Sequence, residues 1–475
     1  MRIVSRSASA VVALVFVGAM SLSAPSVRAA PAAAASTARL VLDIAPGDRS
    51  SQVGVMTQVG DALFFVANDH AHGKELWRTD GTTAGTVMVK DIWKGSAPWP
   101  PYPSDLTAVG GVLYFAATDR RHGRELWKSD GTEAGTAMVK DIWPGSDGSG
   151  PDGLTDSNGT LFFAADDGIH GLELWRSDGT DAGTFMVKDI WPGPDRSFPN
   201  PHGPWYTPDP ELRDVDGMLY LAVNDGTHGW ELWRSDGTET GTAMVKDIWP
   251  GPRPRVNPPG AFTDLDGRLY FQAIDHARVL WELWKSDGTE AGTVMLKPLW
   301  PGGLTAVGDT LYFTANDDIH GDELWKSDGT EAGTVMVQDI WPGSDSSRPG
   351  SLVDVGGTLY FSADDDTHGD ELWKSDGTEA GTVMVTDIVP GSGSSTLGHF
   401  ATAGSTLCFQ ASDDQHGAEL WKSDGTRAGT VRVVDVYRGE GSSDPLAISS
   451  LGGSVLFIAY TPATGRELWS VRLDL

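Results

Sequence analysis

The chain has 475 residues, and its 59 Gly and 28 Pro are too many turn-formers for a long helical bundle. Its 19 Trp and 40% hydrophobic residues exclude wholesale disorder, and its single Cys excludes an internal disulfide framework or a multi-Cys zinc site. A formal net charge of −30 would repel a phosphate backbone, so we expect no nucleic acid as partner.

The first 29 residues have the pattern of a secretory signal peptide. Arg2 and Arg6 precede an apolar run that ends near Ala24, and cleavage is expected after Ala29. A membrane anchor is the alternative, but the run is shorter than the ~20 residues that a span needs. We therefore expect a secreted, extracellular protein without a membrane span once residues 1–29 are removed, and a disordered lead-in over residues 30–38.

Residues 39–475 form one tandem array. The tripeptide Glu-Leu-Trp occurs nine times, at spacings of 41 to 58 residues. The unit at 350–391 predicts four short strands joined by Gly- and Asp-rich turns, and these strands are 351–355, 358–363, 370–375 and 382–388. No stretch shows a sustained helical period. Four antiparallel strands in about 48 residues have the size of a propeller blade.

The two ends of the array predict a closed ring. Residues 41–47 resemble an isolated fourth strand, whereas the last unit, 447–471, has three strands and no separate fourth strand. The N-terminal strand can complete the last sheet, which removes exposed strand edges. We therefore predict an all-β, closed β-propeller of about nine four-stranded blades. Eight blades and an open β-solenoid are the alternatives.

The repeated motif resembles that of a known family. Glu-Leu-Trp-x-Ser/Thr-Asp-Gly-Thr is similar to the motif of the bacterial ELWxxDGT repeat proteins, exported proteins that are sometimes labelled hyalin-like. Eight of the nine units carry Asp-Gly-Thr at the matching offset, whereas the ninth continues from Trp469 as Ser470-Val471. The resemblance covers residues 39–475. It implies secretion and a β-repeat architecture, but no reaction and no substrate.

Residues that recur in every unit are best explained as structural. We expect the Glu-Leu-Trp tryptophans to pack between neighbouring blades; they are Trp77, Trp127, Trp175, Trp233, Trp284, Trp325, Trp373, Trp421 and Trp469. The Asp of each Asp-Gly-Thr can accept backbone N–H bonds that lock its loop; the set is Asp80, Asp130, Asp178, Asp236, Asp287, Asp328, Asp376 and Asp424.

Metal binding is the alternative at two recurring positions. Each Asp-Gly-Thr loop offers few of the roughly six to eight oxygen ligands that calcium takes, so calcium stays only an alternative there. Seven units also carry Asp-x-x-His-Gly between the second and third strands. Equivalent positions in a large ring lie far apart, and each Asp can bond its own His or turn backbone. We therefore expect no metal site and no cofactor.

Departures from the repeat are the candidates for function. Pro-rich insertions fall in three connections between units, at 94–104, 192–210 and 250–259. Their aromatic residues can stack on sugars or anchor a protein; the candidate partner-binding residues are Trp99, Tyr102, Trp205 and Tyr206. A ring-capping role is the alternative for these loops. The fifth unit also departs at 275–281, which we ascribe to drift, with a rim site as the alternative.

We expect a non-enzymatic propeller that binds an extracellular polysaccharide or protein partner through the loops of one face. The chain contains no Gly-x-Ser-x-Gly, His-Glu-x-x-His, P-loop or dinucleotide motif, and no catalytic residue is singled out. Two other functions stay open. One is a carbohydrate-active enzyme with acid/base carboxylates near the central channel, and the other is a calcium-dependent adhesion protein.

Overall fold

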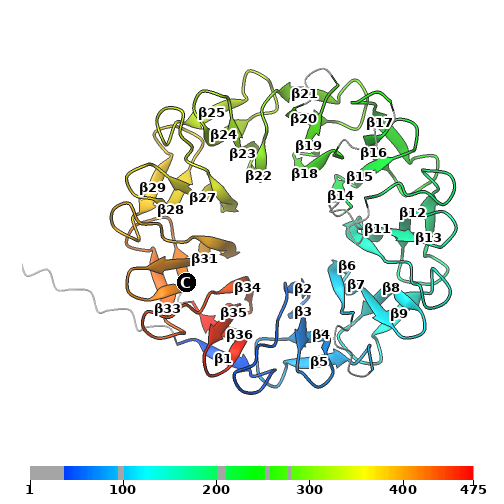
Figure 1. Cartoon of the computed structure of the whole chain (residues 1–475), viewed down its shortest axis with the longest axis horizontal. Coiled ribbons are helices and arrows are strands. Elements are labelled where there is room, and N and C mark those ends of the chain that lie inside the picture. The colour runs from blue at the N-terminus through cyan, green and yellow to red at the C-terminus, as the bar shows by residue number, and fades with distance from the viewer. Residues whose placement is uncertain (1–36, 95–100, 200–209, 252–256, 277–279, 474–475) are drawn as a thin grey trace, which may run out of the picture. The chain divides into compact units, whose positions relative to one another are not determined.

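A computed structural model describes residues 37–94, 101–199, 210–251, 257–276 and 280–473. Its strands form nine separate four-stranded sheets that are arranged as the blades of a ring (Figure 1). The nine-blade propeller is therefore confirmed, and the eight-blade and open alternatives are excluded. Over the same ranges, no helix is long and apolar enough to cross a membrane.

Each blade is an antiparallel meander with its first strand nearest the middle of the ring (Figure 1). From blade 1 to blade 9, the first strands are β2 (Thr57–Val59), β6 (Ser104–Val109), β10 (Asp152–Ser157), β14 (Leu212–Val215), β18 (Gly260–Leu265), β22 (Gly302–Val307), β26 (Gly350–Val355), β30 (Gly398–Ala403) and β34 (Leu446–Leu451). The second strands are β3 (Ala62–Asn68), β7 (Val112–Asp119), β11 (Thr160–Asp166), β15 (Met218–Asn224), β19 (Arg268–Ile274), β23 (Thr310–Asn316), β27 (Thr358–Asp364), β31 (Thr406–Asp413) and β35 (Ser454–Thr461).

The third strands carry the Glu-Leu-Trp motif, and the fourth strands form the outer edge. The third strands are β4 (Lys74–Thr79), β8 (Gly123–Ser129), β12 (Leu172–Ser177), β16 (Trp230–Ser235), β20 (Trp281–Ser286), β24 (Asp322–Ser327), β28 (Asp370–Ser375), β32 (Gly417–Ser423) and β36 (Gly465–Arg472). The fourth strands are β5 (Val87–Lys90), β9 (Ala137–Lys140), β13 (Phe185–Lys188), β17 (Ala243–Lys246), β21 (Val294–Lys297), β25 (Val335–Gln338), β29 (Val383–Thr386), β33 (Val431–Val434) and, in blade 9, β1 (Arg39–Leu42).

The ring is closed by β1, which completes blade 9 as predicted. It pairs antiparallel with β36, with Leu40 opposite Trp469. Beyond β1, the backbone N–H groups of Ile44 and Ala45 each donate to the Glu467 carboxylate at 3.2 Å. The two ends of the array are thus joined within one sheet, and blade 9 has its fourth strand.

The hydrophobic core lies between blades rather than inside one sheet. Each apolar cluster combines residues of two neighbouring blades. Between blades 1 and 2, for example, Trp127 packs with Phe64 and Leu76 of the preceding blade. The strands are therefore buried on both faces, and the aromatic residues fill the wedge between adjacent sheets.

Lysine side chains of blades 1, 2, 3, 5, 6 and 7 bond the loop of the next blade. Lys90 of blade 1 donates to the Thr136 carbonyl of blade 2 at 2.6 Å, and Lys128 of blade 2 donates to the Gly179 carbonyl of blade 3 at 2.8 Å. We call these contacts lysine latches. They recur as Lys140 to Thr184, Lys188 to Thr242, Lys285 to Gly329, Lys297 to Thr334, Lys326 to Gly377 and Lys374 to Gly425.

Candidate functional site

The Asp-Gly-Thr loops satisfy their own polar groups. In blade 2, Asp130 Oδ1 accepts the backbone N–H of Thr132 at 2.8 Å and its hydroxyl at 2.7 Å, and Gly135 N donates to Thr132 Oγ1 at 3.0 Å. The Thr132 hydroxyl holds the pKa of Asp130 below its usual value. The same bonds recur from Asp80 to Asp424. These carboxylates lock turns.

The Asp-x-x-His pairs are also local. In blade 3, the ring atom Nδ1 of His170 lies 2.8 Å from Asp167 Oδ2, and the backbone N–H of His170 donates to Asp167 Oδ1 at 2.9 Å. The hydrogen bond to Asp167 raises the pKa of His170. Among the residues that the structure describes, no three His, Cys, Asp or Glu side chains converge to hold a metal ion.

The Glu of each Glu-Leu-Trp motif has a role that sequence reasoning missed. Glu125 is 0% exposed. Its carboxylate accepts the N–H groups of Ile142 and Trp143 at 3.2 Å and both the N–H and the hydroxyl of Ser149, at 2.9 and 2.5 Å. It thereby fixes the connection from one blade to the next. Equivalent backbone bonds hold for Glu75, Glu173, Glu231, Glu323, Glu371, Glu419 and Glu467.

The buried glutamates make stability depend on pH. Burial raises the pKa of Glu125 to about 7 and that of Glu173 to about 8. Between the ordinary value of 4.5 and these values, the folded state binds more protons than the unfolded state, so stability falls as pH rises. The loop aspartates have lowered pKa values, so their contribution is lost only below their ordinary value of 3.8.

We therefore expect the thermal unfolding midpoint to be higher at about pH 5.5 than at about pH 8.5. Differential scanning calorimetry at constant ionic strength measures this difference. A repeat in about 0.5 M salt screens the general repulsion of an acidic surface but leaves the buried groups largely unscreened. A midpoint that rises with pH across this window would contradict the assignment of the glutamates.

The penultimate residue of each first strand belongs to a ring of equivalent positions, which we call the axial rim. Each of these residues pairs with the second residue of the second strand; they are Gln58, Ala108, Asp156, Asp214, Asp264, Ala306, Asp354, Thr402 and Ser450. None is basic. Asp156 and Asp354 are exposed, and each accepts the N–H of the Gly three residues later, at 2.8 and 2.7 Å.

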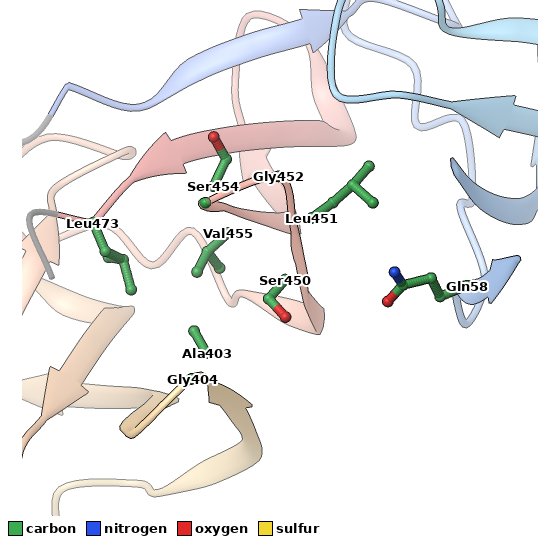
Figure 2. A pocket seen from close by; sticks show the side chains of 10 residues that line it. Gln58, Ala403, Gly404, Ser450, Leu451, Gly452, Ser454, Val455 and Leu473 are labelled. Carbon is green, nitrogen blue, oxygen red and sulfur yellow. The ribbon is translucent and has the colours of Figure 1, made fainter. Parts of the chain in front are cut away.

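Part of the axial rim lines a cavity where blades 8, 9 and 1 meet. Its volume is about 280 Å³. Figure 2 shows Gln58 of β2 across from Ser450 and Leu451 of β34, with Ala403 of β30 below them. Neighbouring first strands are also joined directly, since the Thr57 hydroxyl donates to the Leu106 carbonyl of the next blade at 3.1 Å. Side chains from different blades therefore share one surface at the axis.

Of the four aromatic residues expected to bind a partner, the structure describes only Tyr102. Its side chain is 49% exposed, and the Lys74 ammonium group lies 4.7 Å from the centre of its ring. It lines a cavity of about 350 Å³ between blades 1 and 2, together with Lys74 and Asp105. Trp99, Trp205 and Tyr206 lie outside the described residues.

Comparisons with known proteins identify no family. No family model matches the chain, and no curated protein matches it. Among solved structures, a puromycin-hydrolyzing peptidase of Mycobacterium tuberculosis shares 11% identity at a TM-score of 0.41, covering 90% of this chain and 61% of its own. A puromycin hydrolase mutant shares 14% identity at a TM-score of 0.39, and the match covers 86% of this chain and 59% of that one. A prolyl endopeptidase shares 13% identity at a TM-score of 0.40, and the match covers 76% of this chain and 55% of that one.

These comparisons correct one expectation. The sequence led us to expect a non-enzymatic binder of an extracellular polysaccharide or protein, but puromycin hydrolases, a puromycin-hydrolyzing peptidase and a prolyl endopeptidase are among the solved structures that match, which contradicts that expectation. The chain spans about three fifths of the length of those that match first, and likenesses this distant assign no reaction to it. The family resemblance, the exclusion of nucleic acid and the calcium alternative stay predictions.

Proposed function

We propose that the chain is the propeller part of a peptidase and that it holds extended, cationic peptides along its axis. The observation that carries this proposal is the arrangement of the first strands. Each one is hydrogen-bonded to the second strand of its own sheet and is the edge of that sheet nearest the middle of the ring (Figure 1). An extended peptide can add to such an edge through its backbone. In that conformation its peptide bonds stay accessible to a hydrolytic group.

The charge of the axial rim favours a cationic peptide. Four of its positions are Asp, and none is Lys or Arg. The whole chain carries a formal charge of −30, so its field attracts cations and repels acidic peptides. The uncharged positions, among them Gln58, Thr402 and Ser450, supply hydrogen-bonding groups beside the carboxylates. Peptides rich in Lys or Arg are therefore the substrates that suit this surface.

Export belongs to the same proposal. The pattern of residues 1–29 and the resemblance to exported ELWxxDGT repeat proteins both support secretion. Mass spectrometry of the protein in the culture fluid tests it. We expect a mature chain that begins at Ala30, whereas an intact chain retained inside the cell would contradict export.

We expect the double variant Asp156→Asn, Asp354→Asn to bind a Lys-rich extended peptide roughly tenfold more weakly than the wild type. Asn keeps the side-chain oxygen that accepts the Gly N–H, so each turn persists while the charge is lost. Fluorescence anisotropy with a labelled peptide measures the affinity. The matched control is Asp130→Asn, Asp328→Asn, which makes the same charge change in two Asp-Gly-Thr loops.

Two outcomes would contradict the proposed binding of cationic peptides. One is equal affinity for Lys-rich and Glu-rich peptides, and the other is an equal loss in the rim variant and its control. The peptidase role is tested in the organism that encodes the chain. Hydrolysis of the Lys-rich peptide in its culture fluid should fall when the chain is deleted and return with the wild type or the control, but not with the rim variant. Hydrolysis that survives the deletion would overturn it.

A further inference from the structure

A pocket between blades 4 and 5 has no role in the function proposed above. Its volume is about 350 Å³. We call it the seam pocket, and its walls include Pro199, Glu211, Asn257, Pro259, Gln272 and Trp281. A volume of this size, apolar walls and a few converging polar groups are typical of a small-molecule site. The seam pocket lies at the start of the first strands, whereas the axial rim lies at their end.

Glu211 makes this seam different from the others. It stands opposite Ala222, whose N–H donates to the Glu211 carbonyl at 3.3 Å. The equivalent residues of the other blades are mostly Gly, and none is Glu; they are Gly54, Ser104, Asp152, Gly260, Gly302, Gly350, Gly398 and Leu446. β14 also pairs without the register shift found in its neighbour β18. The longer carboxylate side chain of Glu211 thus stands where five other blades have Gly, and only blade 3, with Asp152, also has an acidic residue.

The carboxylate is held in place by the next blade. Glu211 Oε1 accepts the N–H of Phe262 at 2.8 Å, which leaves Oε2 for a ligand in the pocket. Burial raises the pKa of Glu211, while the nearby Arg213 guanidinium acts in the opposite direction. The Phe262 N–H and the positive charge of Arg213 both oppose the effect of burial, which is the larger and leaves the pKa raised. A fixed, partly buried carboxylate of this kind favours a positively charged partner.

The other walls complete a site for a cation on an apolar stem. The face of an indole such as that of Trp281 attracts a guanidinium or ammonium group, and proline rings pack against methylene groups. The amides of Asn257 and Gln272 add hydrogen-bonding groups. We infer that the seam pocket binds a guanidinium or ammonium group carried on a short aliphatic stem. The group can belong to a free amine or to the side chain of a basic residue.

Isothermal titration calorimetry of the full mature chain with agmatine tests the inference. We expect saturable binding with one site, at least tenfold weaker in Glu211→Gln and severalfold weaker in Trp281→Leu. Gln can still accept the Phe262 N–H, and Leu occurs at the equivalent position of blade 3, Leu172, so both variants are expected to fold. The charge-matched control is Asp309→Asn, at an exposed turn of blade 6, which should bind agmatine like the wild type.

Further ligands test the charge of the bound group separately from its shape, and a free amine separately from a peptide side chain. 1-Butylurea is a neutral analogue of the guanidinium group and should bind at least tenfold more weakly than agmatine. Tighter binding of acetyl-arginine methylamide assigns the pocket to a peptide side chain, and tighter binding of agmatine assigns it to a free amine. Equal binding of butylurea and agmatine, or full affinity in Glu211→Gln, would overturn the inference. The rim variants leave this pocket intact, so their failure in peptide binding is a separate result.

Discussion

Replacing Glu125 by Ala should cost the protein on the order of 4 kcal/mol of unfolding free energy. The side chain is 0% exposed, and its carboxylate accepts four hydrogen bonds from the connection that leads to blade 3. Ala leaves the donors of Ile142, Trp143 and Ser149 without partners in a buried place. Each unpaired buried donor costs ~1–3 kcal/mol, less what water can recover by entering the gap.

Two matched variants show whether this loss belongs to the hydrogen bonds. Glu125→Gln keeps one acceptor oxygen but brings a donor against the remaining N–H groups, so it should lose a large part of the same stability. Glu133→Ala removes an exposed Glu from a loop of the same blade and should stay within about 0.5 kcal/mol of the wild type. Urea unfolding at fixed pH gives the three values. A loss below about 1 kcal/mol for Glu125→Ala would show that the hydrogen bonds of Glu125 contribute little to the stability of the fold.

Removal of residues 30–45 should have the second large effect, because it deletes β1 and opens the ring. The deletion exposes the edge of β36 and uncovers Leu456 and Leu468, which pack against Val41. It also takes away the Ile44 and Ala45 N–H groups bound by Glu467. We expect a lower thermal midpoint and self-association through the open edge, measured by calorimetry and by light scattering after size exclusion.

A peptide supplied in trans gives the sharp version of this experiment. The segment 37–47 contains β1 and the residues that Glu467 holds, and it should bind the truncated chain and restore a monomer by strand addition. The control peptide carries Val41→Asp, which places a charge at a position that is 1% exposed and should not rescue. A truncated chain that stays monomeric at the wild-type midpoint would show that closure contributes little.

Most of the fold could be predicted because it is repeated. The nine repeats of the unit predicted nine blades, and the unmatched strand near Val41 predicted that the ring closes through blade 9. Glu125 was missed for a physical reason. Alternation along a strand distinguishes a buried face from an exposed one, but the third strands are buried on both faces, so Glu, Leu and Trp are equally inaccessible. The sequence signal that could have indicated this role is a charged residue that recurs inside the third strand of every unit.

The candidate site was harder to predict because it depends on positions across blades. Asp156 and Asp354 stand near the ends of ordinary first strands, and only the radial arrangement of the blades places these strands nearest the middle of the ring. The sequence did mark the insertion at 250–259 and the segment at 275–281 as departures. It could not show that Glu211, on the preceding blade, lines one pocket with Pro259 and Trp281. Three of the four aromatic candidates lie outside the described residues, and their role stays a prediction.

The lysine latches have a consequence for how such a chain can change its length. A unit such as that of blade 2 carries both the ammonium group that bonds the following loop and the loop that the preceding unit bonds. A duplicated unit therefore arrives with both halves of a working junction, and the loss of a whole unit leaves both neighbours matched. Duplication or deletion of an entire unit therefore preserves the latch at junctions such as those on either side of blade 2, while a partial copy would lose one half of it. The wedge angle between sheets, rather than any new contact, sets the copy number at which the circle closes.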